Sequence, residues 1–313
     1  MIKAYIVLAH KNGEQVYRML KRLDDNQSFF FLHIDKNSSL EEFKDVVNTF
    51  TKKIKLVKRV AIEWGGFGLV QATINALQEI KKHPLLFEWI ILLSGQDYPI
   101  KPNNFINQFL KSTSYEAFFE YTLIPNYPRW SPRGGSYRVD KYYFGSQPSF
   151  KIAAKFINFF AGMFPVIRRP VLRKIKPYAG SQWWLMNANT MNFVLNYIEQ
   201  KPYYTAFHKF TFAADEVFFH SIILNSDILK DKVENNNKRF YIWPDTSKAH
   251  PELLEEKDLD TIKNSDALFA RKFDLEHDPH ILDSVDKNCI DLDYQNVSSD
   301  KTQIFIKEVS ING

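Results

Sequence analysis

The stretch Trp89–Ile100, WIILLSGQDYPI, constrains the fold more than any other part of the chain. Its apolar run, residues 90–93, is too short for a helix and too apolar for an edge strand, so it predicts a buried central strand of a parallel sheet. The polar residues Ser94–Asp97 follow at the carboxyl end of this strand, where open α/β sheets bind their ligands. Pro99 is expected to stop the strand, because proline has no ladder donor. The sequence therefore predicts a polar loop at the functional edge of a sheet.

Strand-like and helical segments alternate over the first 120 residues. Strands are expected at 4–9, 29–35, 54–60, 89–93 and 116–120, and helices at 13–23, 40–50, 69–82 and 103–110. This alternation predicts an α/β fold with a doubly wound, mostly parallel sheet. No GxGxxG follows the first strand and no GxxxxGK[ST] occurs, which argues against a Rossmann dinucleotide fingerprint and a P-loop.

Three divisions of the chain are expected. Residues 1–120 form a Rossmann-like first half and residues 121–275 the second half of a single domain, and residues 276–313 form a C-terminal extension. The one cysteine, Cys289, excludes an intrachain disulfide and favours a reducing compartment. We expect no signal peptide before the first strand, and no apolar stretch reaches the roughly 18 residues of a membrane span. We therefore expect a cytoplasmic protein without a nucleic-acid partner.

Charge is distributed unevenly. The segment Lys141–Lys176 has eight Lys or Arg and no Asp or Glu, which leaves the rest of the chain at −3 out of a total of +5. The same segment is rich in phenylalanine. Two interpretations stay open: peripheral contact with an anionic membrane at the inner face of the cell membrane, or a helix that packs on the domain with solvated lysines.

Two candidate sites lie in the first half. Asp35 ends a predicted strand, and an acid there can accept hydrogen bonds from a base or ribose, although a helix-capping or surface acid is the simpler alternative. Trp64 precedes three glycines, Gly65, Gly66 and Gly68. Glycines let a backbone approach a ligand and Trp64 supplies a flat ring, whereas a plain turn explains only the glycines.

The proline- and glycine-broken stretch 126–135 follows Glu120 and contains several rings and guanidinium groups, including Arg129. Such a loop either binds sugars or covers the sheet. The first interpretation is preferred because Glu120 ends a predicted strand on the same edge as Asp97.

In the second half, a strand is expected at Gly180–Trp184 and another at Lys238–Trp243. Asp215 and Glu216 are expected to open a helix, where acids commonly offset the helix dipole. The same dipole favours an ionised carboxylate that can accept a proton. Further on, Arg271 and Lys272 stand between aromatic residues, an arrangement that suits a diphosphate but also fits ordinary surface charge.

Seven motifs occur in a fixed order: YIVLAHK at 5–11, HID at 33–35, WGGFGLVQA at 64–72, LLSGQDYPI at 92–100, GSQWW at 180–184, DE at 215–216 and LFARKFD at 268–274. Together they resemble the core-2 and I-branching β-1,6-N-acetylglucosaminyltransferase family, which also includes peptide O-xylosyltransferases. The resemblance implies a bacterial-type member with a GT-A-type fold and inverting transfer from a UDP-sugar. It also implies that residues 1–120 are the nucleotide-binding half and residues 121–275 the acceptor-binding, catalytic half, with Glu216 as the catalytic base.

The resemblance assigns the remaining site residues as well. The expected donor-binding residues are Val7, Leu8, Ala9, Asp35, Trp64, Gly180, Ser181, Lys272, and Lys248 or His250 in place of an arginine of the family. The expected acceptor-binding residues are Asp97, Glu120 and Arg129.

No metal or other cofactor is expected, because the resemblance implies basic side chains in place of a metal. The triplets Asp258–Asp260 and Asp291–Asp293 match DxD but lie late in the chain, and we interpret them as chance. Glu276, His277, Asp278 and His280 are possible ligands, but a polar tail explains them better.

Four functions remain at this point. The preferred one is transfer of N-acetylglucosamine from its UDP-sugar to a glycan or lipid-linked glycan acceptor, and the first alternative uses UDP-xylose. A glycoside hydrolase with Asp97 and Glu216 as its two carboxylates is a third. A non-catalytic nucleotide- or glycan-binding module is the fourth.

Overall fold

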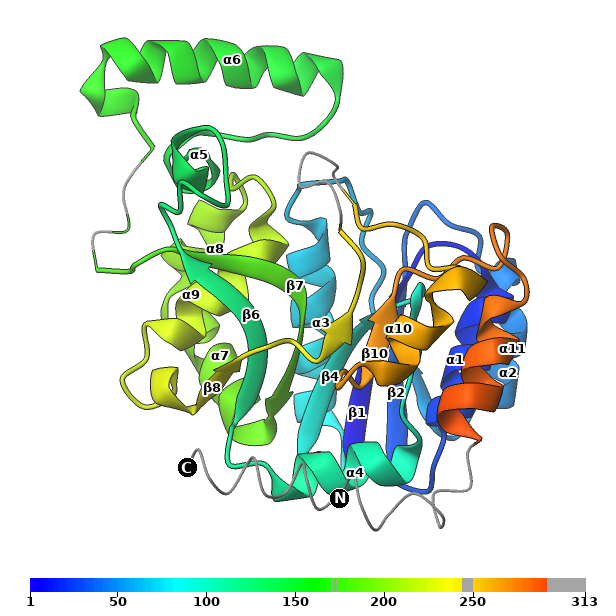
Figure 1. Ribbon diagram of the computed structural model, residues 1–313. Coiled ribbons are helices and arrows are strands. Elements are labelled where there is room, and N and C mark those ends of the chain that lie inside the picture. The colour runs from blue at the N-terminus through cyan, green and yellow to red at the C-terminus, as the bar shows by residue number, and fades with distance from the viewer. Residues whose placement is uncertain (170–171, 173, 244–249, 292–313) are drawn as a thin grey trace.

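The computed structural model describes residues 1–169, 172, 174–243 and 250–291. Within this part of the chain, a seven-stranded sheet has the order β3-β2-β1-β4-β7-β6-β8 (Figure 1). Its strands are β1 (Lys3–Ala9), β2 (Ser28–Ile34), β3 (Ile54–Leu56), β4 (Trp89–Ser94), β6 (Ala117–Leu123), β7 (Tyr178–Asn187) and β8 (Val233–Asn235). β7 is antiparallel to both β4 and β6, and the other pairings are parallel. The predicted α/β class with a mostly parallel, doubly wound sheet is confirmed.

Helices cover both faces of this sheet (Figure 1). The α-helices of the described residues are α1 (Gly13–Leu23), α2 (Lys44–Thr49), α3 (Gly68–Lys82), α4 (Asn103–Ser112), α5 (Tyr137–Asp140), α6 (Pro148–Met163), α7 (Ala188–Gln200), α8 (Pro202–His208), α9 (Phe218–Leu224), α10 (Leu259–Asn264) and α11 (Ile281–Val285), of which α6 lies apart from the sheet. None of the helices among the described residues has the length and apolar character needed to cross a membrane.

Alternation along β1 creates two hydrophobic cores. Tyr5 and Val7 face the core formed with α1, α2, α4, α10 and α11, while Ile6 and Leu8 face the core formed with α3, α7, α8 and α9. Successive side chains of a strand point to opposite faces, so a strand that is buried on both sides must be apolar throughout. β4 meets the same condition, and the predicted central strand therefore lies between β1 and β7.

The polar residues after β4 enter a second, smaller sheet. Its order is β5-β10-β9, formed by Asp97–Pro99, Phe269–Arg271 and Arg239–Phe240. Asp97 pairs with Arg271 in the antiparallel register. The expected loop is therefore a tight turn into a short strand, and the strand expected at 238–243 is reduced to two residues. This small sheet brings the residues that follow β4 next to Arg271 and Lys272, which lie far from them in sequence.

Two expected boundaries in the first half are wrong. The strand expected at 54–60 ends at Leu56, because side chains replace the ladder beyond it: the Arg59 guanidinium donates to the carbonyl oxygens of Ile34, Asp35 and Ser38. The helix expected at 40–50 begins with a 3-10 turn, Glu41–Phe43, before α2.

The described part of the C-terminal extension shares the first core. Ile281, Leu282 and Val285 of α11 are buried there, and Asp286 forms ion pairs with Arg18 and Arg22 of α1. In the sheet, β7 from the second half lies between β4 and β6 of the first. The division at residues 120 and 275 stays a prediction, and residues 292–313 lie outside the described part.

Candidate active site

Glu216 lies at the end of a 3-10 turn, Ala214–Glu216, that precedes α9. Ala213 adopts a left-handed conformation, φ 50°, and the amide of Glu216 donates to its carbonyl oxygen. The amide of Ala213 donates in turn to the carbonyl oxygen of Gly65 at 2.8 Å. The prediction that Asp215 and Glu216 open the α-helix is therefore wrong in detail. The turn places Glu216 against the Trp64 loop, far from it in sequence.

An arginine that the sequence reasoning missed pairs with Glu216. Arg138 Nη1 lies 2.7 Å from Glu216 Oε2, and the Arg138 side chain is 8% exposed whereas that of Glu216 is 33% exposed. The guanidinium also lies 5.1 Å from the centroid of the Trp130 ring and 5.8 Å from that of Phe212. One Glu216 oxygen is thus held by a buried cation, and the carboxylate keeps contact with solvent. Such a carboxylate can accept a proton.

Asp215, the neighbour of Glu216, is nearly fully buried. Burial, followed by the Glu216 carboxylate, raises the pKa of Asp215 to about 7. Two adjacent acids therefore have different environments, one apolar and the other paired with Arg138. Of the two, Glu216 has the exposure that a group acting on substrate needs.

Trp64 connects the Glu216 turn with the basic end of the site. Its ring is 53% exposed, and its centroid lies 5.4 Å from that of Phe212 and 6.4 Å from that of His250. Gly65, φ +73°, is required at this contact, because a Cβ there would lie 2.8 Å from a Phe212 ring carbon. The glycines of this loop therefore do more than form a turn.

The carboxyl end of β1 meets Asp35. The Asp35 amide donates to the carbonyl oxygen of Ala9 at 2.8 Å, and its carboxylate accepts from the amides of Asn37 and Ile62. Asp35 is thus a buried acid that holds a turn, and neither the helix-capping nor the surface role describes it. Its contact with a nucleotide stays a prediction. Val7, Leu8 and Ala9 are buried, so any contact of these residues with a ligand would be through the backbone at the strand end.

Cations crowd together beside this strand end. Burial, Arg271 and Lys11 lower the pKa of Lys272, and burial, Lys272 and Arg271 lower the pKa of His250. Lys11 is paired with Asp274 at 2.6 Å. Positive groups that depress one another's pKa are poised for an anion, because a bound anion would remove the repulsion. Lys248 lies outside the described residues.

Asp97 is fully buried. Its carboxylate accepts from the Ser94 amide at 2.7 Å and lies 3.7 Å from Arg271 Nε and 4.0 Å from Arg239 Nε. Arg271, which the sequence analysis paired with Lys272 as a possible diphosphate-binding cation, stacks on Trp183 with its guanidinium 4.3 Å from the ring centroid. Asp97 was expected to bind the acceptor. In this structure its carboxylate pairs with Arg271, and the residue has no exposed surface that could contact a sugar.

Glu120 and Arg129 do come together. They form an ion pair, and the hydroxyl of Tyr241 donates to the second Glu120 oxygen. A polar cavity of about 350 Å³ opens here, lined by Glu120, Asn235, Asn236, Asn237, Arg239, Phe240, Tyr241, Ser265, Asp266 and Ala267. Tyr241 is a further residue that sequence reasoning missed.

Gly180 supports the same cluster from β7. A Cβ at this position would lie 1.8 Å from the Glu120 carbonyl oxygen, at an irregularity in the β6–β7 register. Only glycine allows this close approach. The hydroxyl of Ser181 accepts from the amide of Trp183. Both residues shape the strand beside Glu120 and Arg271.

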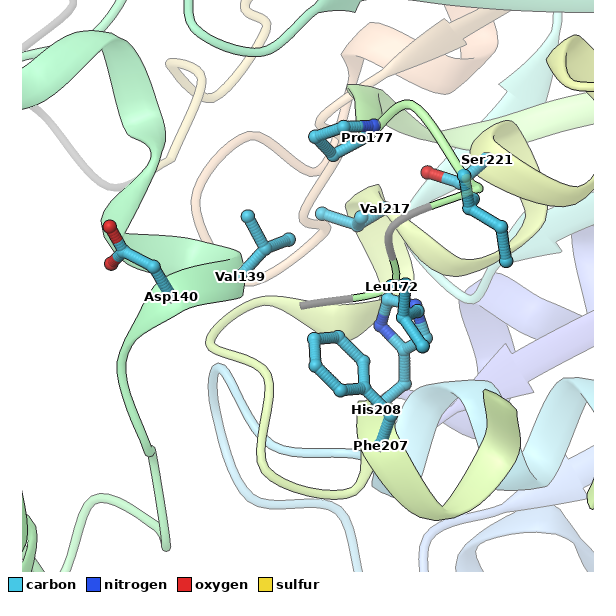
Figure 2. Close-up of a pocket in the computed structure, with 9 residues that line it drawn as sticks. Val139, Asp140, Leu172, Pro177, Phe207, His208, Val217 and Ser221 are labelled. Atoms are coloured by element: carbon cyan, nitrogen blue, oxygen red, sulfur yellow. The ribbon is translucent and has the colours of Figure 1, made fainter. Parts of the chain in front are cut away.

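A second cavity, of about 100 Å³, is apolar. Figure 2 shows side chains from α5 and α8 and from the segments around Pro177 and Val217 around it. His208 lies in its wall, and burial and Arg169 hold the pKa of that imidazole well below its usual range. Neither of the two cavities is lined by Glu216 or Lys272.

No group of three or more His, Cys, Asp or Glu among the described residues is arranged to hold a metal ion. His277, one of the possible ligands, pairs instead with Glu255 at 2.7 Å, and Asp258 caps the turn that begins after Glu255. That the protein works without a metal or other cofactor stays a prediction.

The fold and site define an α/β protein with a paired, solvent-accessible carboxylate at one end of an aromatic bridge and a cluster of cations at the other. A profile of the Core-2/I-Branching enzyme family matches residues 3–263. The chain belongs to this family, and the resemblance seen in the motifs is confirmed.

Individual relatives are distant. The chain is 24% identical to "Beta-glucuronosyltransferase GlcAT14A" of Arabidopsis thaliana over 88% of its length, and covers 61% of that protein. It is 22% identical to "N-acetyllactosaminide beta-1,6-N-acetylglucosaminyl-transferase" of Mus musculus, over 97% of the chain and 75% of the relative. Among solved structures, S. aureus TarS aligns over 99% of the chain and 78% of its own, with a TM-score of 0.36 and 12% identity.

Proposed function

We propose that the chain is an inverting glycosyltransferase that moves a sugar from a UDP-sugar to a hydroxyl of a glycan acceptor. One observation carries the proposal: the Glu216 turn is bonded to the Trp64 loop, and the Trp64 ring lies beside His250 in the cation cluster. A base and a diphosphate-binding cluster are thus joined by one exposed aromatic ring. Membership of the Core-2/I-Branching enzyme family supports the same reaction.

The proposed step is direct displacement at the anomeric carbon. The acceptor oxygen attacks from the face opposite UDP, Glu216 takes the hydroxyl proton, and the bond from the anomeric carbon to the diphosphate oxygen breaks. UDP leaves with the bonding electrons, Lys272 and Arg271 neutralise its charge, and the imidazole of His250 donates a hydrogen bond to it. Arg138 holds one Glu216 oxygen, which leaves the other to face the acceptor. No metal takes part in this scheme.

Donor and acceptor would occupy the two ends of the site. Asp35, the backbone of β1 and the Trp64 ring would hold the uridine, and Gly180 and Ser181 would form the wall near the sugar. His250 would take the role of the family's arginine. Lys272 and Arg271 lower its pKa, which indicates that the imidazole lies near these two diphosphate-binding cations. Glu120, with its partners Arg129 and Tyr241, would bind the acceptor, and Asp97 would act by positioning Arg271.

N-acetylglucosamine is the donor sugar we propose, with a glycan or lipid-linked glycan as acceptor. The relatives carry names that include glucuronosyltransferase and xylosyltransferase, so UDP-xylose and UDP-glucuronate are the competing donors. UDP release, measured for UDP-N-acetylglucosamine, UDP-xylose, UDP-glucuronate and UDP-glucose, tests the choice. A preference for another donor would refute N-acetylglucosamine as the donor sugar but not the transfer reaction. If none of the four donors releases UDP with a panel of glycan acceptors, the proposed glycosyltransferase activity is refuted.

A glycoside hydrolase needs two carboxylates facing one sugar. Asp97, the expected second carboxylate, is buried against two arginines, which disfavours that alternative. A binding module without turnover is separated by the same UDP-release assay. A cytoplasmic location, peripheral to the inner face of the cell membrane, is part of the proposal and rests on the single cysteine and the basic segment 141–176.

A further inference from the structure

Residues 141–169 form an excursion from the domain, which we call the arm, with α6 as its main element. Figure 1 shows α6 apart from the sheet and its covering helices. The buried residue Arg169 ties the two ends of the arm together and to the domain. It donates to the carbonyl oxygens of Arg138 and Lys141, both at 2.9 Å, and to that of Phe207 at 2.8 Å. The root of the arm is therefore fixed, and it is fixed to the backbone of the arginine that pairs with Glu216.

Only a narrow stripe of α6 faces the domain. Ala154, Asn158 and Ala161 are its least exposed residues and recur at i, i+4 and i+7. The Asn158 side chain bonds to both the amide and the carbonyl of Tyr142, at 2.8 and 2.9 Å. Small residues and one amide thus line the domain-facing side of the helix, and none of the large apolar side chains of α6 is buried.

The opposite side of α6 is apolar and exposed. Ile152, Phe156, Phe159, Phe160 and Met163 recur at i, i+4, i+7, i+8 and i+11 and are 42–63% exposed. Ten large apolar side chains of the arm are exposed in all: Phe150, Ile152, Phe156, Ile157, Phe159, Phe160, Met163, Phe164, Val166 and Ile167. A patch of this size marks an interaction surface. The alternative of a helix with its apolar face packed on the domain is not what the structure has.

Charge indicates what covers this surface. Lys151 and Lys155 lie one turn apart beside the apolar stripe, and the segment 141–176 has no acidic residue. Among its described residues, the exposed cations are Lys141, Lys151, Lys155, Arg168, Lys174 and Lys176. A second copy of the chain would oppose cations to cations, whereas a bilayer with anionic headgroups offers apolar and negative groups together.

We propose that α6 lies in the plane of an anionic membrane surface, with Phe156 and Phe159 at the acyl boundary and Lys151 and Lys155 at the lipid phosphates. With 16 residues it lies on the bilayer and does not span it. The fixed root at Arg169 then holds Arg138 and Glu216 close to the lipid. If the proposed function holds, this membrane contact assigns a lipid-linked glycan as the acceptor; this part of the inference rests on the proposed function.

Vesicle flotation of the full chain tests this. Two compositions are compared, phosphatidylcholine alone and equimolar phosphatidylcholine and phosphatidylglycerol, at low salt. We expect flotation with the second only. The double variants Phe156→Asp with Phe159→Asp, and Lys151→Glu with Lys155→Glu, should each reduce the floated fraction at least tenfold. Leu86→Asp, which changes an equally apolar side chain that is 87% exposed outside the arm, should float like the wild type.

Three results would overturn the inference. They are no flotation of the wild type with the anionic vesicles, equal flotation with both compositions, and self-association in sedimentation that the phenylalanine variants abolish, which would make a second copy the occupant. UDP binding and circular dichroism of each variant report folding. The four substituted residues are exposed on α6 and lie outside the residues proposed to bind UDP. Retained UDP binding in a variant that no longer floats therefore separates failure of the membrane site from failure of the proposed function.

Discussion

Replacing Lys272 by methionine removes one cation from the cluster while keeping an unbranched apolar side chain. A charge-assisted hydrogen bond contributes roughly 1.5–3 kcal/mol. Arg271 and Lys11 remain beside the site and partly compensate. We therefore expect the lower part of that range, about 1.5–2 kcal/mol, which is roughly a 10- to 30-fold increase in the Kd for UDP.

Isothermal titration calorimetry with UDP and with uridine measures the effect. Uridine has no diphosphate, so its affinity should not change. The matched control is Lys52→Met, an exposed lysine that precedes β3 at the amino edge of the sheet. The pKa of Lys272 is lowered, so the folded protein gains nothing from its charge, and the variant should be no less stable than the wild type. An unchanged Kd for UDP, or an equal loss for uridine, would refute the role of Lys272.

The pH dependence of UDP binding has a definite sign. Lys272, with its lowered pKa, loses its proton at a lower pH than an ordinary lysine, so the affinity of the wild type for UDP should fall as pH rises through the alkaline range. Lys272→Met should lack that fall. Parallel pH profiles for the two proteins would assign the titration to another group.

Three further outcomes are expected. Gly180→Ala should lower the free energy of unfolding in urea by at least about 2 kcal/mol, because its Cβ would lie 1.8 Å from a carbonyl oxygen, whereas Gly162→Ala, with nothing within 4 Å, should be neutral or slightly stabilising. The raised pKa of Asp215 means that its contribution to stability is present at pH 4 and lost towards pH 7, with a slope of up to about 1.4 kcal/mol per pH unit; Asp215→Asn should remove this slope from pH-dependent unfolding. Tyr241→Phe should raise the acceptor KM and leave the donor KM unchanged, and an altered donor KM alone would place Tyr241 with the nucleotide.

The first half of the fold could be predicted because its signals are local. α1 occupies the expected residues 13–23, and β4 is the buried strand that its apolar run indicates. The insertion of β7 between β4 and β6, antiparallel to both, has no local signal. It depends on pairings between residues 55 to 98 positions apart.

The site was predictable where a residue type alone limits its chemistry. Trp64 and Glu120 are such cases, since a ring among glycines and an acid at a strand end suggest ligands. Arg138 was missed because nothing in the sequence links it to Glu216, 78 residues away. The burial of Asp97 depends on Arg239 and Arg271, which the strands β9 and β10 of the small sheet bring next to it. Composition predicted the apolar and basic character of α6, but only the structure shows that its large side chains are exposed.

The proposal depends most on Glu216 as the base, and Glu216→Gln tests it most directly. The amide keeps the size of the side chain but cannot accept the acceptor's proton, so transfer measured by UDP release should fall by about 10²- to 10⁴-fold. The Kd for UDP should stay within about twofold of the wild type, since Glu216 lies at the other end of the Trp64 bridge. Transfer at the wild-type rate by a folded Glu216→Gln protein would contradict the account.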